Sequence, residues 1–201
     1  MTLWLLLIAA LLLGIERVCY VWIARAPGSF QRWCARPLVA RLGEPVSVVR
    51  SLFIGFKVLQ ALVFAGWCLA LGDGSPAPRE GVALGLGALL VLVGQILSGL
   101  VFYRLGRVGI FFGDRLGYDV PWCHAFPFSV LSHPQYVGTV MTIWGFFLIA
   151  RYPHDDWVLL PALETIYYVA GACLESDAVR WTGEELEYHA APPDRSPTRA
   201  R

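Results

Sequence analysis

Five long apolar runs, separated by shorter polar links, dominate the pattern of the chain. They cover residues 3–24, 52–71, 81–103, 136–150 and 157–174. A helix needs about 20 apolar residues to cross the hydrocarbon core of a bilayer. The pattern therefore predicts an all-α fold, a polytopic transmembrane helical bundle of about five spans. Glu16 and Arg17 interrupt the second half of the first run, and four spans plus a re-entrant first segment are the alternative.

The composition supports a membrane protein. Apolar residues make up 57% of the 201 residues and charged residues 15%, against about 45–50% and about 25% in soluble domains. The net charge of +1 gives no reason to expect a nucleic-acid partner. Five cysteines without a CxxC spacing argue against a disulfide framework and a zinc site, so we expect no metal. Residues 1–189 form one predicted integral-membrane domain, and residues 190–201 a disordered cytoplasmic tail.

Arginines indicate the orientation of the spans. They concentrate in the link after the first run, in the link after the third run and in the C-terminal tail. Positive residues favour the cytoplasmic side of a membrane, so five spans place the N-terminus outside and these three segments in the cytosol. A cleaved signal peptide is the alternative reading of the first run, but a positive leader and a small-residue cleavage site are missing.

The first segment with candidate chemistry is LGRVGIFFGDRLG, residues 105–117. Its four glycines recur at helical spacings of three or four, so we expect a helix face that another helix, a lipid or a ligand can approach closely. Asp114 follows Gly113 within this face. The alternative is tight helix packing near the interface, with Asp114 paired to an arginine: Arg104, Arg107 or Arg115.

The second segment is FPFSVLSHPQYVG, residues 126–138. Pro127 and Pro134 break helix geometry, which predicts a loop that enters the fourth span at about Gln135. His133 and Tyr136 then lie at a helix N-terminus, where free N–H groups favour a carboxylate or phosphate. The alternative is an ordinary His and Tyr of the interfacial aromatic belt.

Two acids mark the last run. Glu175 directly follows an apolar helix, at the start of the segment ESDAVRWTGEELEY, where a carboxylate opposes the helix dipole. Glu164 lies within the run itself. Acids inside a membrane are candidates for function, but Glu164 also has structural alternatives: an ion pair with Lys57 or a hydrogen bond with Tyr167 or Tyr168.

Together these segments resemble the phosphatidylethanolamine and phospholipid N-methyltransferase family. The first segment fits the family pattern LGxxGxxxGDxxG, and the second resembles FPFxxLxxPxYxG. The second also resembles the HPxYxG element of a wider membrane methyltransferase group that includes isoprenylcysteine carboxyl methyltransferases. The likeness covers roughly residues 91–188. It departs from the family at two places: Leu92 replaces the first glycine of a GxG, and Ser176 replaces the second acid of a Glu-Glu pair.

The resemblance implies a membrane enzyme that uses S-adenosylmethionine and methylates the amine of phosphatidylethanolamine or its mono- and dimethyl forms, toward phosphatidylcholine. The implied partner is a phospholipid in the bilayer, and the implied site faces the cytosol, in the endoplasmic reticulum or in a bacterial inner membrane. The implied catalytic residues are Asp114, His133 and Glu175. Those for the cofactor are Gly94, Gln95, His133, Tyr136, Glu175 and Ser176. Those for the lipid are Gly109, Gly113, Asp114, Phe126 and Tyr136.

Aromatic side chains near this site could attract a methylated ammonium by cation–π interaction. They are Phe111, Phe112, Trp122, Phe126, Phe128 and Tyr136. Two other functions stay open. One is methylation of a prenylcysteine carboxylate or another isoprenoid, and the other is a non-enzymatic helical membrane protein. The oligomeric state and the methylation steps are open as well.

Overall fold

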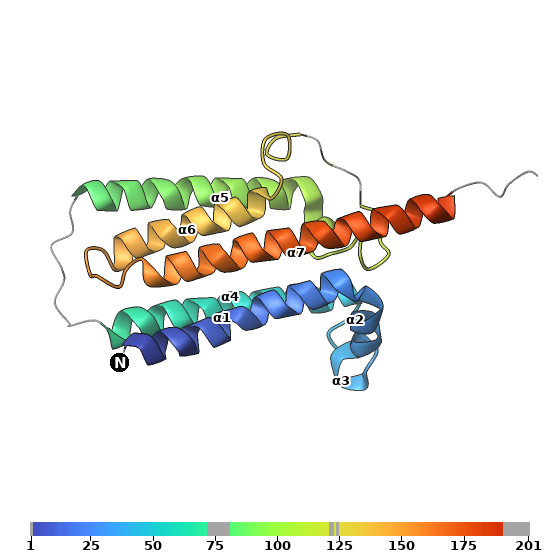
Figure 1. Cartoon of the computed structure of the whole chain (residues 1–201), viewed down its shortest axis with the longest axis horizontal. Coiled ribbons are helices and arrows are strands. Elements are labelled where there is room, and N and C mark those ends of the chain that lie inside the picture. The colour runs from blue at the N-terminus through green and yellow to red at the C-terminus, as the bar shows by residue number, and fades with distance from the viewer. Residues whose placement is uncertain (1, 72–80, 121–122, 124, 191–201) are drawn as a thin grey trace, which may run out of the picture.

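Helices account for all the regular secondary structure in the part of the chain that the structure describes. The computed structural model describes residues 2–71, 81–120, 123 and 125–190, and residues 175–190 by their backbone alone. The elements are α1 Thr2–Arg25, α2 Pro27–Cys34, α3 Pro37–Ala40, α4 Pro45–Ala70, α5 Gly81–Ile110, α6 Pro134–Ala150 and α7 Leu159–Ala190. The predicted all-α bundle is confirmed (Figure 1). Residues 191–201, the predicted tail, lie outside the described residues.

Five of these helices carry the five apolar runs. α1, α4 and α5 are long and apolar enough to cross a membrane, with mean hydropathy of 2.0, 1.9 and 2.2. α6 and the apolar part of α7, Leu159–Leu174, are shorter. Large apolar side chains such as Leu11, Leu62 and Leu69 point outward and are exposed. An outer surface of this kind suits lipid and not water.

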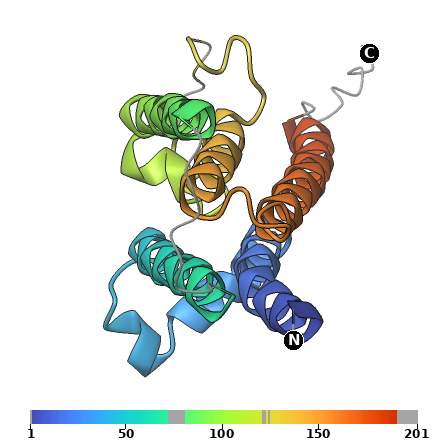
Figure 2. The same ribbon diagram turned by 90° about the vertical axis from the view of Figure 1, so that its left-hand side faces the viewer.

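The long helices pack one against the next in an order that does not follow the chain, as the end-on view in Figure 2 shows. α4 packs on α1, α1 on α7, α7 on α6, and α6 on α5. α5 and α6 form the most extensive of these contacts. α4 and α5 lie at the two ends of this packing order, and they pack against each other less than the neighbouring helices do.

Glycines bring α5 and α6 into backbone contact. A Cβ atom added to Gly87 would lie 2.8 Å from the carbonyl oxygen of Gly145, and one added to Gly138 would lie 2.7 Å from that of Gly94. The two glycines of each helix are seven residues apart, which places them on one face. Small residues drive helix association in lipid because they let backbones approach closely.

The predicted glycine-lined helix face over residues 105–117 is wrong. α5 is kinked at Gly106, where φ is 63°, and it ends at Ile110. Gly117 has a φ of 88°, and the backbone N–H of Gly113 donates to the carbonyl of Val108 at 2.9 Å. Positive φ is readily adopted by glycine, so these glycines turn the chain back over the end of α5.

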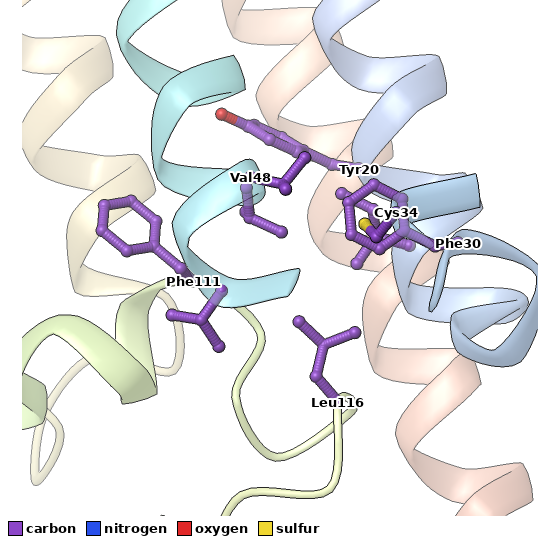
Figure 3. Close-up of a cluster of buried hydrophobic side chains, with 9 residues drawn as sticks. Tyr20, Phe30, Cys34, Val48, Phe111 and Leu116 are labelled. Carbon is purple, nitrogen blue, oxygen red and sulfur yellow. The ribbon is translucent and has the colours of Figure 1, made fainter. Parts of the chain in front are cut away.

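That turn is fixed by an apolar cluster shown in Figure 3. Phe111 and Leu116 from the turn pack with Tyr20 of α1, Phe30 of α2 and Val48 of α4. Two hydrogen bonds support the cluster. Gln31 Nε2 donates to the carbonyl of Leu116 at 3.1 Å, and the Tyr118 hydroxyl donates to Glu44 Oε2 at 3.1 Å. The segment after α5 therefore bridges to the far side of the bundle.

We expect Gly94→Val to lower the thermal unfolding temperature in detergent, because its new Cβ would meet the Gly138 carbonyl and lie 2.5 Å from Thr142 Oγ1. Overpacking of this kind costs about 1–3 kcal/mol. Gly99→Val is the matched control on the same helix, since a Cβ there has no neighbour within 4 Å. Equal shifts for the two variants would contradict the glycine contact.

Candidate active site

Charged side chains from three apolar helices meet inside the bundle. Glu16 of α1 is 4% exposed, and its Oε1 lies 3.2 Å from Lys57 Nζ of α4. Lys57 Nζ also donates to Gln60 Oε1 at 3.1 Å and to the hydroxyl of Tyr168 at 3.0 Å. Gln60 Nε2 donates to Glu164 Oε1 of α7 at 2.6 Å. Buried charges in a membrane protein face the interior and pair in this way.

The partner of Glu164 differs from each predicted one. The hydrogen bond comes from Gln60, while the Tyr167 hydroxyl donates to the carbonyl of Ala10 at 2.9 Å. Lys57 lies within ion-pair distance of Glu16. From the sequence, Glu16 and Arg17 were expected only to interrupt an apolar run. A signal for the cluster is that three apolar runs each carry charge, and the charges are of both signs.

Arg17 lies beside this cluster with its guanidinium over an aromatic ring. Its Cζ is 3.9 Å from the centre of the Tyr168 ring and 5.8 Å from that of Tyr136. Arg17 Nη2 is 3.1 Å from Glu16 Oε1. Within the described residues, however, none of the three guanidinium nitrogens has a well-directed hydrogen bond.

A cavity of 280 Å³ opens next to these charges, where α1 and α5 end and α4 and α6 begin. It brings together residues of the two family-like segments. Gly109, Asp114, His133 and Tyr136 line it, and so do three of the candidate aromatic residues, Phe111, Phe112 and Phe128. Glu16, Arg17 and Lys57 line the same cavity. The cavity therefore combines charges of both signs, an imidazole and aromatic faces.

His133 and Tyr136 lie as the proline pattern predicts. α6 begins at Pro134, and His133 is its N-cap residue. The rings of His133 and Tyr136 stack, with centres 5.6 Å apart and planes inclined by 16°. Burial lowers the pKa of the His133 imidazole below its ordinary value, because an apolar environment disfavours the charged form. His133 is therefore neutral at pH 7 and able to accept a proton.

Asp114 pairs with one of the three predicted arginines. Its Oδ2 lies 3.4 Å from Arg115 Nε, and its side chain is 58% exposed. Gly113, next to it, does not line the cavity and serves the turn after α5. Phe126 is 51% exposed and lies off the cavity wall, whereas Phe128, two residues later, lines it.

The predicted cofactor residues of α5 lie apart from this cavity. Gly94 is buried against the backbone of α6, and Gln95 Nε2 donates to Thr142 Oγ1 at 3.2 Å. The side chains of Glu175 and Ser176 lie outside the described residues, as does Trp122. The backbone of α7 places Glu175 four residues after Gly171, whose Cα faces the guanidinium of Arg17.

A second space of 580 Å³ lies beside the cavity. It lies between α4 and the α5–α6 pair. Phe53, Lys57, Gln135 and Thr139 line both spaces. Most of its other lining residues are apolar, among them Phe64, Phe102 and Phe146. We call this space the lipid-side groove, because it borders the cavity and most of its wall is apolar.

Comparisons with known proteins point to one family. The sequence profile described as phospholipid methyltransferase matches residues 82–180. The phosphatidylethanolamine N-methyltransferase of Rattus norvegicus is 30% identical over 145 residues, which cover 70% of this chain and 71% of the rat protein. The phosphatidyl-N-methylethanolamine N-methyltransferase of Arabidopsis thaliana is 43% identical over 54 residues, 27% of this chain and 33% of the plant protein. No solved structure matches the chain significantly.

The apolar helices indicate an integral membrane protein, and a cavity lined by charged and aromatic side chains lies at one end of its bundle. The chain belongs to the phospholipid methyltransferase family. Family membership implies a methyl donor, and it confirms the resemblance that the two sequence segments indicated.

We expect Gln60→Leu to destabilise the protein by about 1–3 kcal/mol. The substitution removes the amide that donates a buried hydrogen bond to Glu164. The measurement is thermal unfolding in detergent. Gln95→Leu makes the same change at an exposed hydrogen bond and should shift stability by less than about 0.5 kcal/mol.

The double variant Gln60→Leu/Glu164→Leu removes both partners and should recover much of the loss. A double variant as unstable as Gln60→Leu alone would show that the hydrogen bond to Glu164 is not the reason for the loss.

Proposed function

We propose that the chain transfers methyl groups from S-adenosylmethionine to the amine of phosphatidylethanolamine or of its mono- and dimethyl forms. The observation that carries the proposal is that the cavity and the lipid-side groove lie side by side and share four lining residues. A phospholipid has a charged head group and apolar chains, and this pair of spaces offers both environments side by side. The printed names of the rat and plant relatives support the same chemistry.

The residues at the cavity fit a sulfonium cofactor. The aromatic side chains of Tyr136 and Phe128 line the cavity, and aromatic rings attract organic cations. His133 is the N-cap residue of α6, and the positive end of the helix dipole there favours a carboxylate. When bound, S-adenosylmethionine supplies an electrophilic methyl group. We assign the turn from His133 to Tyr136, together with Glu175, to the cofactor, and Asp114 to the neighbourhood of the lipid amine.

The reaction asks two things of the protein. The amine must be held in line with the methyl group, which is a positioning task. The amine must also be neutral, although an alkyl ammonium is mostly protonated at pH 7. His133 is the proposed proton acceptor, because its lowered pKa keeps it neutral at that pH.

The lipid reaches the cavity sideways, through the groove between α4 and the α5–α6 pair. Its chains stay at hydrocarbon depth while its head group lies at the level of the helix ends. The distribution of arginines supports a cytosolic position for this end of the bundle. The soluble cofactor then comes from the cytosol and the lipid from the cytosolic leaflet.

The test offers purified protein three lipids in separate vesicle preparations, with radiolabelled S-adenosylmethionine. The lipids are phosphatidylethanolamine and its mono- and dimethyl forms, and chromatography resolves the products. We expect label in at least one of them, and the pattern of labelled lipids defines the accepted steps. Label in a prenylcysteine substrate and in none of the three lipids would move the assignment to the carboxyl methyltransferases. The absence of cofactor binding would contradict a methyltransferase function altogether.

The pH dependence tests the role of His133. The neutral imidazole accepts the proton, so activity should fall as the pH drops through its pKa. Because burial lowers that pKa, the midpoint of the fall lies below the ordinary value of about 6.5. We expect His133→Gln to lose about 100-fold in rate and to lose this acidic limb.

His154→Gln is the control for that experiment, since His154 lies between α6 and α7 and does not line the cavity. An acidic limb that persists unchanged in His133→Gln would assign the proton to another group.

A further inference from the structure

Arg17 lies in the cavity wall, and the described part of the protein leaves its hydrogen-bonding capacity unused, as it does that of the Tyr20 hydroxyl. Its side chain is 9% exposed, yet none of its three nitrogens has a hydrogen-bond partner among the described residues. Arginine offers five N–H donors in a fixed plane. Buried polar groups are nearly always hydrogen-bonded, so an exception needs an explanation.

Glu16 does not supply that explanation. Its Oε1 lies 3.1 Å from Arg17 Nη2 and 3.2 Å from Lys57 Nζ, so one oxygen is shared by two cations. The contact with Arg17 also lacks the direction of a hydrogen bond. The ring of Tyr168 covers the guanidinium at 3.9 Å, a contact that satisfies the face of the guanidinium but not its N–H groups at the edge. Those edge donors remain available to an anion in the cavity.

We propose that Arg17 binds the phosphodiester of the phospholipid substrate. This inference rests on the proposed function for the identity of the ligand. An arginine fork matches the oxygens of a phosphate, and the pair is stronger than a neutral hydrogen bond. The carboxylate of the methyl donor is the other anion that the reaction brings to the cavity, and the position of Lys57 decides between the two.

The position of Lys57 favours the phosphodiester. Arg17 lies near the start of α6, since its guanidinium is 5.8 Å from the ring of Tyr136, and both anions could reach that level. Lys57, however, interacts with the same Glu16 oxygen as Arg17 and lines both the cavity and the lipid-side groove. A lipid with its chains in that groove brings its phosphate to these two cations.

The test measures lipid binding without turnover. Dihexanoyl-phosphatidylethanolamine is titrated with the full chain in a phosphate-free detergent, without methyl donor, and its ³¹P resonance is followed. We expect Arg17→Gln to weaken binding about 10- to 100-fold, as the loss of hydrogen bonds to a charged group does. Arg25→Gln makes the same change at an exposed arginine of the same helix and should alter binding less than about 2-fold.

A second measurement separates the two anions. Calorimetry gives the dissociation constant of S-adenosylmethionine for the same variants, and we expect Arg17→Gln to leave it within about 2-fold. Weaker cofactor binding with unchanged lipid binding would assign Arg17 to the cofactor carboxylate and overturn the proposal. Lipid binding equal to that of the unmodified protein would overturn it as well.

A charge-neutral double variant excludes a purely structural role. Glu16→Gln/Arg17→Gln removes the acid and the base together, so it leaves no buried acid without its arginine. If Arg17 only balances Glu16, this variant should regain lipid binding, which would contradict the proposal. We expect binding to stay weak. Arg17→Lys, which keeps the charge but loses the planar fork, should bind with intermediate affinity and serves if Arg17→Gln does not fold.

These measurements also separate the inference from the proposed function. Lipid binding that depends on Arg17, in a protein that methylates none of the three lipids, would support the phosphate site and reject the methyl transfer. Methylation that proceeds with unchanged lipid binding in Arg17→Gln would support the methyl transfer and reject the phosphate site at Arg17.

Discussion

The structure depends on satisfying, inside the bundle, the charges that three apolar helices carry into the membrane. Glu16, Lys57 and Glu164 come from α1, α4 and α7 and are linked by the Lys57–Glu16 ion pair and the chain of hydrogen bonds through Gln60. A charged side chain at the centre of a membrane helix costs about 2.5–3.5 kcal/mol on insertion scales. Rotating one of these helices would turn a charge toward lipid. The cluster therefore fixes the rotation of the three helices relative to one another.

α5 and α6 are held together by a different kind of contact. Gly87 and Gly94 meet Gly145 and Gly138 backbone to backbone, and α6 has no charged residue. This pair joins the rest of the bundle through the packing of α6 on α7 and through the cluster formed by the turn after α5. The cavity and the lipid-side groove lie where the two units meet. The cavity and the groove thus form where the charge-linked helices α1, α4 and α7 meet the glycine-packed pair α5 and α6.

The sequence predicted the type and approximate position of the helices, but not the side-chain contacts in the interior of the bundle. Long apolar runs fix element type, and Pro134 fixes the start of α6 within one residue of the predicted position. The glycines of residues 105–117 were misinterpreted because a spacing of three or four fits a helix face and a series of turns equally well. The partner of Glu164 lies 104 residues away in the sequence, a contact that no local pattern encodes. Gly109, Asp114, His133 and Tyr136, which two short motifs carry, all line the cavity.

The charges of the cavity wall suit a ligand that is itself zwitterionic. Arg17, Lys57 and Arg115 stand beside the carboxylates of Glu16 and Asp114. A phosphoethanolamine head group brings one anion and one cation, so it can meet both signs without adding net charge to a poorly hydrated space. Methylation leaves the charge of that head group unchanged, because each product is again an ammonium. A phosphate held by Arg17 would therefore keep the same position through successive methyl transfers, while only the aromatic surroundings of the nitrogen adapt to its growing size.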